Sequence, residues 1–592
     1  MAPRAQKKFE IVLAETAGFC MGVRRAVRRV LDATDDPRSR RPIRTHGPLI
    51  HNRQVLQVLR RRGVTALEEG EPENGGTIVI RAHGLPLEEQ KRLRADWPHL
   101  LDATCPHVAR VQDIVEEYSG KGYLCVVVGD RGHAEVESVL SYADGAGHVV
   151  SGPAGVKDLP EAEKVAVVAQ TTQDEQVFRA TVRQVEARYG VCEAFDTICR
   201  STGLRQQEVR QLAGEVDAMV VVGGLHSANT RRLAEISRAA GAPTYHVETE
   251  QELPIGELLS HGRVGLTAGA STPNWMIKRV IRHLENEHRR RTNPVSYRAR
   301  MFWRALVDAD VYAAGGAAAL TFAAAQLLPA SPPTLGLCMA VAFLFVLAQH
   351  LINQYMRRGT LYLRQPSRAD FFLANERKLL GLALGSAALA VLLSVLLGPL
   401  GLGLVLFGTA AGIVYQVRLP RPLALRLGVG SLEQLPGSKE LFVSLAYATL
   451  GAVIPALEAG VGAARWPAVA LVFGVCFVLA FQRTLALDIR EVESDQLVGA
   501  ETLTGALGAR AAQLLYFALS GVLAALLTAG ALGGRLPPLA YLLLASVPYG
   551  VACYLMVKRR RPEGEFAEGL VDGQLFLTGL LAMVWVLISS PG

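Results

Sequence analysis

The sequence begins without an apolar segment, and it is poor in cysteine. Its first ten residues, M-A-P-R-A-Q-K-K-F-E, do not resemble a signal peptide, so we expect the domain that follows to stay in the cytoplasm. Only eight cysteines occur among 592 residues. Cysteines in a reducing compartment are more often metal ligands, catalytic groups or core residues than disulfides, so a disulfide framework is not expected.

Charged residues become scarce in the second half of the chain. Up to about residue 300 the sequence is that of a soluble, charged enzyme, whereas from Val311 onward it is rich in Leu, Ala and Gly. A chain of this length also exceeds what one hydrophobic core normally holds. We therefore predict an α/β domain at residues 9–288, a basic juxtamembrane linker at 289–309 and an all-α membrane domain at 310–592. Because the basic residues stop where the apolar half begins, no nucleic-acid partner is expected.

Nine candidate membrane helices lie in the apolar half. They centre near residues 320, 343, 388, 408, 448, 475, 520, 547 and 580, and each offers about 18 or more mainly apolar residues, enough to cross a bilayer. Lys and Arg follow the second, fourth, sixth and eighth of them, while the intervening loops carry almost none. The positive-inside rule then predicts an inner-membrane protein whose first half is cytoplasmic and whose C-terminus is outside.

Short apolar runs alternate with amphipathic stretches in the first half. Examples are T-I-V-I-R-A-H-G at 77–84, Y-L-C-V-V-V-G-D at 123–130 and A-M-V-V-V-G-G-L at 218–225. Such β-branched runs, each followed by a helix, predict parallel α/β units. Three modules are expected, at about residues 9–100, 101–195 and 196–288. Ligands of such sheets bind beyond the carboxyl ends of the strands.

Three cysteines stand at similar strand-to-helix corners: Cys20 in G-F-C-M-G-V, Cys105 in D-A-T-C-P and Cys199 in D-T-I-C-R. Backbone N–H groups and the positive end of a helix favour a thiolate at such a position. Three thiolates without a fourth protein ligand would leave an open position on a metal. Spacing alone also allows a zinc site or buried core cysteines. The acid three residues before Cys105 and Cys199 is expected to act as a cap or hydrogen-bond acceptor.

Polar turns accompany the cysteine corners. His46, His83 and His133 each lie next to glycine at an expected strand end, and S-A-N-T (227–230) and T-A-G-A-S-T-P-N (267–274) add hydroxyl and amide groups. Such donors at helix N-termini suit phosphate groups. The H-A-E at 133–135 also matches part of a zinc deaminase signature, but the P-C-x-x-C of that signature is missing.

Taken together, these motifs resemble the 4-hydroxy-3-methylbut-2-enyl diphosphate reductases, the LytB/IspH family. The matching stretches run in family order over residues 10–285: G-F-C-M-G-V, T-H-G-P-L-I-H-N, A-H-G, D-A-T-C-P, G-H-A-E-V, A-Q-T-T, D-T-I-C, S-A-N-T and T-A-G-A-S-T-P. The resemblance implies three pseudo-threefold α/β modules around a central [4Fe-4S] cluster held by Cys20, Cys105 and Cys199. It also implies a fourth iron without a protein ligand and an electron donor such as ferredoxin or flavodoxin.

The resemblance further assigns the substrate site. Removal of the substrate hydroxyl as water, with two electrons and protons, gives isopentenyl and dimethylallyl diphosphate. Glu135 would be the proton donor, with His133 near the substrate and Thr171 beside its hydroxyl. The diphosphate would be bound by His46, His83, Ser227, Asn229 and Ser271. Ala228 departs from relatives that carry a hydroxyl there.

The apolar half resembles the UbiA-type membrane prenyltransferases through A-L-D-I-R-E-V-E-S-D-Q-L (486–497) and P-G-S-K-E-L-F-V-S (436–444). In that family two Asp-rich motifs bind magnesium and a prenyl diphosphate. The second motif is present as Asp488, Glu491 and Asp495. The first, at 353–361, retains Asn353 but has Gln354, Arg357 and Leu361 where carboxylates are expected.

An arginine at a magnesium site repels the metal, so half of this site is missing. Two hypotheses follow for the membrane domain. Either it transfers a prenyl group, with Arg357 and Arg358 contacting the diphosphate directly, or it is a non-catalytic anchor or a binder of prenyl lipids. We favour the second.

Overall fold

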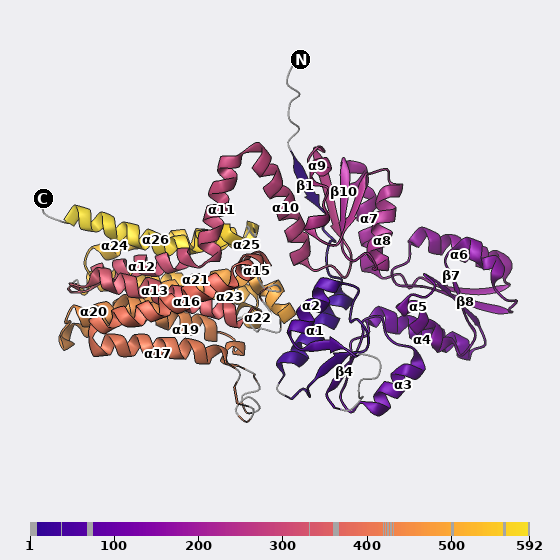
Figure 1. The fold of residues 1–592 in the computed structure, drawn as a ribbon, viewed down its shortest axis with the longest axis horizontal. Coiled ribbons are helices and arrows are strands. Elements are labelled where there is room, and N and C mark those ends of the chain that lie inside the picture. The colour runs from indigo at the N-terminus through magenta and orange to yellow at the C-terminus, as the bar shows by residue number, and fades with distance from the viewer. Residues whose placement is uncertain are drawn as a thin grey trace, which may run out of the picture. The chain divides into compact units, whose positions relative to one another are not determined.

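The computed structural model describes residues 9–589 except 37, 68–74, 331, 359–360, 362–365, 418, 421, 423–425, 427–428, 430, 499–502 and 561–563. The chain forms two compact units, one made of nearly all residues up to Tyr297 and the other of the residues from Arg298 onward (Figure 1). The expected basic linker is helical. It comprises the end of α10 (Asn274–Thr292) and α11 (Pro294–Asp308).

Three four-stranded parallel sheets build the first unit. One has the strand order β1 (Glu10–Leu13), β12 (Arg263–Ala268), β10 (Ala218–Val222), β11 (Thr244–Val247). The second runs β5 (Leu100–Asp102), β4 (Thr77–Ile80), β2 (Ile43–Thr45), β3 (Val64–Ala66). The third runs β9 (Val191–Phe195), β8 (Lys164–Ala169), β6 (Leu124–Val128), β7 (Gly147–Val150). All strand pairs are parallel, as the apolar runs predict.

The modules are not three consecutive stretches of chain. The expected boundary after residue 100 falls within β5, and the one after residue 195 falls at the end of β9. However, β1 pairs with β12 rather than with the strands that follow it. The short apolar run E-I-V-L carries no signal for its partner, because strand pairing is decided by tertiary packing. The first strand therefore completes the sheet formed by the last third of the unit.

Helices cover the sheets of the first unit and bury the strands. They are α1 (Met21–Asp35), α2 (Arg53–Arg61), α3 (Leu87–Asp96), α4 (Pro106–Gly120), α5 (Ala134–Leu140), α6 (Glu175–Arg188), α7 (Arg200–Glu215), α8 (Ala228–Ala239), α9 (Ile255–Leu258) and α10. Every residue of β6 and β10 is buried. Strands buried on both faces need continuous apolar runs, which explains the lack of alternation in V-V-V and M-V-V-V.

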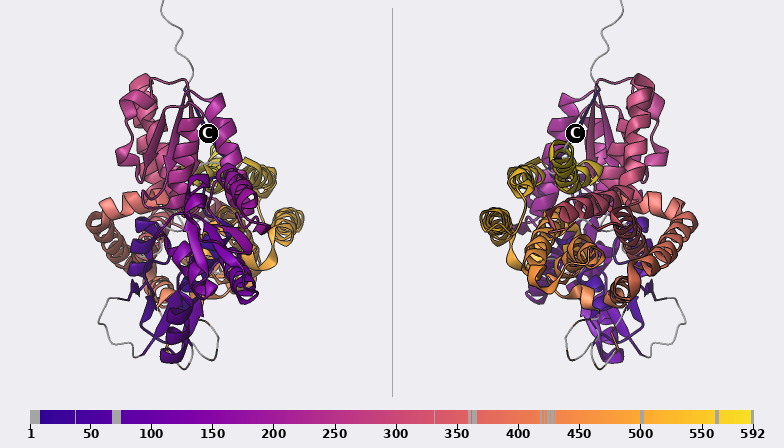
Figure 2. Two further views of the ribbon diagram at one scale, coloured as in Figure 1. Left: turned by 90° about the vertical axis from the view of Figure 1, so that its right-hand side faces the viewer. Right: turned by 90° about the vertical axis from the view of Figure 1, so that its left-hand side faces the viewer.

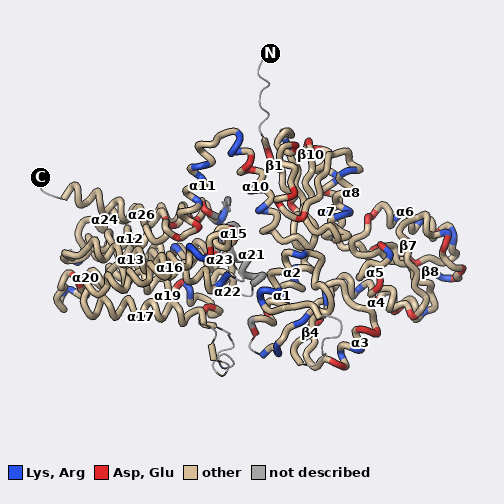
Figure 3. The backbone as a smooth tube through the Cα atoms, in the orientation of Figure 1, with Lys and Arg blue, Asp and Glu red and all other residues tan. Residues whose placement is uncertain are grey.

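The second unit is a bundle of helices, which Figure 2 shows packed side by side. Its longer helices are α11, α12 (Val311–Leu327), α13 (Leu335–Met356), α15 (Pro366–Ala374), α16 (Glu376–Ser394), α17 (Gly398–Gln416), α19 (Ser438–Ala448), α21 (Trp466–Val498), α23 (Ala509–Leu532), α25 (Ser546–Arg560) and α26 (Gly564–Ser589). The shorter ones are α20 (Ile454–Glu458), α22 (Leu503–Leu507) and α24 (Leu539–Leu543). Most charged residues of this unit lie near α15, α22 and the neighbouring helix ends (Figure 3).

Seven segments of the described chain are long and apolar enough to cross a membrane, or up to eight if the bent pair α11 and α12 forms one span. The nine expected centres all fall within helical segments of the described chain. Two of them, near 388 and 408, lie in α16 and α17, which form one 41-residue segment, Glu376–Gln416, joined by a short 3-10 turn. The helix near 320 has only 17 residues and is bent by 68° from α11.

Candidate active site and membrane cavity

The same hydrogen bond fixes each of the three cysteine corners. Cys20 lies just before α1, and Cys105 and Cys199 are the N-cap residues of α4 and α7. Their backbone N–H groups donate to carbonyl oxygens that follow the neighbouring strand: Ala270 at 3.1 Å, Ala82 at 2.9 Å and Thr171 at 3.0 Å, respectively. The three sheets therefore present their cysteines in equivalent positions, each at the positive end of a helix.

The thiols converge beside the first turn of α1. A Cβ atom placed on Gly22 would lie 2.5 Å from Sγ of Cys105 and 4.0 Å from Sγ of Cys20, so only glycine leaves room there. Burial raises the pKa of the Cys20 and Cys105 thiols, and the charge of Cys199 adds to the rise in both. All three cysteines are free of disulfides. A ligand that holds them as thiolates must therefore be a strong Lewis acid.

Three cysteine corners brought together from three sheets form a donor set that suits an iron-sulfur cluster. Among the described residues, no three His, Cys, Asp or Glu side chains are gathered closely enough to hold one ion. A [4Fe-4S] cluster is bound by cysteines on separate irons, so it accepts more widely spaced sulfurs. Three cysteines would hold three irons of such a cluster and would leave the fourth without a protein ligand.

A buried arginine supports the same corner. Arg205 of α7 is 3% exposed, and its Nε and Nη2 donate to the carbonyl of Thr16 at 2.9 and 2.6 Å. Nη2 also donates to the carbonyl of Gly18 at 2.8 Å. Its charge lowers the pKa of the Cys20 thiol, against the larger effect of burial. Arg205 thus holds the loop before Cys20 and offers a buried positive charge to a negatively charged group bound by the cysteines.

The acids three residues before two of the cysteines shape the turns that lead to them. Oδ1 of Asp102 accepts a hydrogen bond from the N–H of Thr104 at 2.9 Å, and Oδ1 of Asp196 accepts one from the N–H of Ile198 at 3.1 Å. Each is an Asx turn, in which a short carboxylate bonds the backbone two residues on. The expected hydrogen-bond role of these acids is confirmed.

Glu135 and Thr171 meet although they lie in different loops. Glu135 is 2% exposed, and its Oε1 accepts the N–H of Thr171 at 2.7 Å. Burial raises the pKa of this carboxyl, and the N–H and hydroxyl of Thr171 oppose the rise. Because the loop of Thr171 also receives the Cys199 N–H, the acid lies one hydrogen bond from a cysteine corner. A carboxyl with a raised pKa keeps its proton to higher pH than an exposed glutamate does.

Three histidine rings form a cluster beside this acid. The ring centroids of His51 and His83 are 4.5 Å apart, and each lies 5.7 Å from that of His133. Burial lowers the pKa of all three, to about 4 for His133 and well below the ordinary value for His83. Nδ1 of His133 accepts the N–H of Glu135 at 3.2 Å, so the proton of its neutral ring lies on Nε2. The cluster therefore supplies neutral N–H donors.

His51 is a candidate that the sequence reasoning did not select. It stands in the quoted motif T-H-G-P-L-I-H-N, next to the N-cap Asn52 of α2, where a histidine is easily taken for a surface residue. Its backbone carbonyl accepts the Ser271 hydroxyl at 3.2 Å, and a Cβ on Gly224 would lie 2.8 Å from the same oxygen. This contact joins the loops of two sheets. No local sequence signal separates it from a surface histidine, because its place in the site rests on contacts with distant residues.

Several buried polar atoms near these loops have no hydrogen-bond partner among the described residues. They are Nδ1 of His46, Nε2 of His51, Nδ1 of His83, and both Nδ2 and Oδ1 of Asn229. Asn229 is 4% exposed, and Ser227 just before it caps α8 by accepting the N–H of Thr230 at 3.4 Å. Nε2 of His46 faces Oε1 of Glu89 at 3.3 Å. Buried polar groups are normally satisfied, so these atoms mark a place for a polar ligand.

The expected magnesium residues of the second unit are differently arranged. Asp488 is fully buried, and its Oδ1 receives Nζ of Lys439 at 2.7 Å. Glu491 and Asp495 lie on α21, but their side chains are outside the described part of the chain. Asn353 lines a cavity of about 530 Å³ in this unit. The ammonium group of Lys439 stands where a cation would bind Asp488, so the described residues do not fit a magnesium ion.

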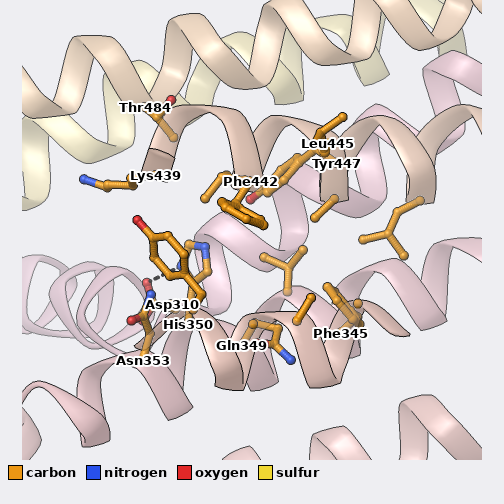
Figure 4. Close-up of a pocket in the computed structure, with 18 of the residues that line it drawn as sticks. Asp310, Phe345, Gln349, His350, Asn353, Lys439, Phe442, Leu445, Tyr447 and Thr484 are labelled. Atoms are coloured by element: carbon orange, nitrogen blue, oxygen red, sulfur yellow. Dashed lines mark hydrogen bonds and ion pairs between the residues drawn. The ribbon is translucent and has the colours of Figure 1, made fainter. Parts of the chain in front are cut away.

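The cavity has one polar end and one apolar end. Figure 4 shows Lys439, Asn353 and His350 at one side and Phe345 and Leu445 at the other. At the polar end, Gln354 donates to the buried carboxylate of Asp310, which also bonds His350 and Arg368, each at 3.0 Å. Positions 354 and 357 of the incomplete first motif thus belong to networks within the protein.

Comparisons with known proteins agree with this division. Residues 11–285 match the family described as LytB protein, and residues 314–580 match the UbiA prenyltransferase family. The 4-hydroxy-3-methylbut-2-enyl diphosphate reductase of Geobacter sulfurreducens is 44% identical over 276 residues, which are 47% of this chain and 97% of that protein.

Two solved structures resemble the two units. One is a structure of (E)-4-hydroxy-3-methyl-but-2-enyl diphosphate reductase, with 39% identity, 47% of this chain and 99% of the other chain covered, and a TM-score of 0.38. The other is the apo structure of a UbiA homolog from Aeropyrum pernix K1, which is 16% identical. The match covers 47% of this chain and 98% of the homolog, with a TM-score of 0.37. The chain therefore belongs to the LytB family of 4-hydroxy-3-methylbut-2-enyl diphosphate reductases, and its residues 314–580 match the UbiA prenyltransferase family.

Proposed function

We propose that the first unit reduces 4-hydroxy-3-methylbut-2-enyl diphosphate to isopentenyl and dimethylallyl diphosphate. The observation that carries this proposal is the convergence of Cys20, Cys105 and Cys199 next to the buried acid Glu135. The three cysteines come from three separate sheets, and each is fixed by the same backbone hydrogen bond. Members of this family use a [4Fe-4S] cluster, and the cysteine corners suit one.

A bound cluster would supply electrons and a Lewis-acidic iron for the substrate hydroxyl. The chain's own part is to bind, orient and protonate. Glu135, whose pKa is raised by burial, holds a proton for the leaving hydroxyl. Thr171 orients this carboxyl through its N–H and, on the same loop, stands beside the hydroxyl of the substrate.

The diphosphate is held by neutral donors in this proposal. His83 and His133 are kept uncharged by burial, and Asn229 has an unpartnered buried amide. Ser227 and Ser271 add hydroxyl groups, and His46 adds a further ring. Neutral donors bind the phosphate oxygens without the strong charge attraction of several lysines, so the product diphosphate can leave. We add His51 to this set because its ring completes the histidine cluster.

The chain is a multi-pass membrane protein, and we propose that it lies in the inner membrane. The first unit would then be cytoplasmic, where ferredoxin or flavodoxin can deliver electrons, and the C-terminus would be outside. The basic residues of α10 and α11 support this orientation, since Arg289, Arg290 and Arg291 end the last helix before the bundle. A reporter fused to the C-terminus tests it: labelling from outside is expected, and cytoplasmic labelling contradicts it.

Turnover by the full chain tests the reductase proposal directly. Anaerobically purified protein in detergent, given the hydroxylated diphosphate and a chemical reductant, is expected to form both five-carbon diphosphates. Cys199→Ser is expected to abolish turnover, whereas Cys192→Ser, which changes a cysteine outside the three corners, is expected to retain it. Full turnover in Cys199→Ser would refute the proposal.

A further inference from the structure

Cationic side chains line the polar end of the membrane cavity, whereas most of the acids that pair with them do not. Four cationic side chains line it: Arg357, Arg368, Lys439 and Arg483. The acids that pair with three of them, Glu433, Asp488 and Asp572, do not line the cavity. A ligand in the cavity therefore meets positive side chains, and the acids that pair with them offset the cost of their partial burial.

The two acids that do line the cavity are already engaged. Asp310 is bonded by His350 and Arg368, each at 3.0 Å, and by Gln354. Glu568 lies 3.2 Å from the same arginine. Magnesium requires several oxygen ligands at short distance, usually carboxylates. Among the described side chains, no carboxylate of the cavity is left to hold a metal between the protein and an anion.

Unpartnered polar atoms show that the polar end is built for a ligand. The Tyr447 side chain is 3% exposed, and its hydroxyl has no hydrogen-bond partner among the described residues. Gln354 is 8% exposed, and its Oε1 likewise has none. Both residues line the cavity, as does Asn353 with its unpartnered Oδ1. Buried polar groups without partners are costly, so a bound polar head would stabilise them.

Apolar side chains make up most of the rest of the cavity lining, although Gln349 lies beside Phe345. Phe345, Leu404, Phe407, Phe442 and Leu445 line it, and Figure 4 shows Phe345 and Leu445 away from the end that holds Lys439. A volume of about 530 Å³ is in the range of pockets that enclose a molecule of drug size. The occupant must therefore combine an apolar chain with an anionic head.

We propose that this cavity binds an isoprenoid diphosphate directly through nitrogen donors, without a bridging divalent metal. Lys439 and Arg357 contact the phosphate oxygens, and the apolar end takes the chain. Charge-assisted N–H donors, which bind phosphate strongly, replace the metal. This inference goes beyond the reductase activity of the first unit and does not depend on it.

Binding of geranylgeranyl diphosphate to the full chain in lipid nanodiscs tests the proposal. Titrations with EDTA and with magnesium are expected to give affinities within about twofold of each other, because no metal takes part. The double variant Lys439→Met/Asp488→Met removes both charges of a pair and leaves neither one buried alone. We expect it to weaken binding roughly tenfold or more, the loss of one charge-assisted contact.

Arg465→Met is the matched control, since Arg465 does not line the cavity and its loss should leave the affinity unchanged. Binding to the reductase unit would survive the double variant, so loss of binding identifies the membrane cavity. Three results would overturn the proposal: binding that requires magnesium, unchanged binding in the double variant, or equal affinity for geranylgeraniol, which lacks the anionic head.

Discussion

Replacing Glu135 by Gln should remove the proposed proton donor while leaving its loop in place. The side chain is 2% exposed and nearly isosteric with Gln, and the amide oxygen can still accept the Thr171 N–H that Oε1 accepts at 2.7 Å. The hydrogen bond is therefore kept, and the substitution should cost no more than about 1 kcal/mol of folding free energy. Loss of a positioned acid typically costs about 10²- to 10⁴-fold in rate. We expect kcat to fall in that range with the cluster retained.

The assay compares kcat and iron content of wild type and Glu135→Gln in the same anaerobic preparation. Glu137→Gln, two residues on along α5, is the matched control and should keep its activity. The pH dependence gives a second readout. Because burial raises the pKa of Glu135, the protonated acid persists to higher pH than on an exposed glutamate, and the wild-type rate should fall as pH rises through that raised pKa. A variant that keeps more than about a tenth of wild-type kcat would refute the role of Glu135 as the proton donor.

Further predictions concern the cysteine corners and the histidines. Gly22→Ala should lower the iron content sharply, because its Cβ would lie 2.5 Å from a cysteine sulfur. Gly203→Ala is the control and should leave the iron content unchanged, because a Cβ there would have nothing within 4 Å. Iron analysis of the two purified variants tests this prediction. Burial lowers the pKa of His133 to about 4, so the folded protein binds this proton less tightly than the unfolded chain does. The free energy of unfolding should therefore decline by up to roughly 3 kcal/mol as pH falls from about 6.5 to 4. Hydrogen exchange of the α5 amides measures this decline, and no change over that pH range would contradict it. Arg205→Gln should make the cluster harder to reduce by removing a buried positive charge; a midpoint potential that stays constant or rises would count against this role.

The fold of the first unit is well predicted by local sequence, apart from its strand order. Runs such as V-V-V in β6 are long and β-branched, and a fully buried parallel strand is the structure that suits them. The pairing of β1 with β12 could not be predicted, because four residues of strand hold no information about a partner some 250 residues away. In the second unit, the nine centres expected from hydropathy all fall within helical segments, but hydropathy does not show where α16 and α17 join or that α12 is short.

Site residues were predictable where a motif fixes them locally and were missed where contacts are long-range. Each cysteine corner is formed by three or four consecutive residues, and the acids of D-A-T-C and D-T-I-C shape the turn within that stretch. His51 and Arg205 act through contacts with distant loops, which no local pattern reveals. Likewise, Lys439 lies 49 residues from Asp488, and only the folded bundle shows that an ammonium group occupies the neighbourhood of that carboxylate.

The most direct test of the account is the iron and sulfide content of the anaerobically purified full chain and of its single cysteine variants. We expect a brown protein with about four irons per chain. Iron should be severely reduced in each of Cys20→Ser, Cys105→Ser and Cys199→Ser, and Cys125→Ser should be the unaffected control. Two results would contradict the cluster assignment. One is a colourless protein that contains one zinc per chain, and the other is a cluster that stays intact when any one of the three cysteines is replaced.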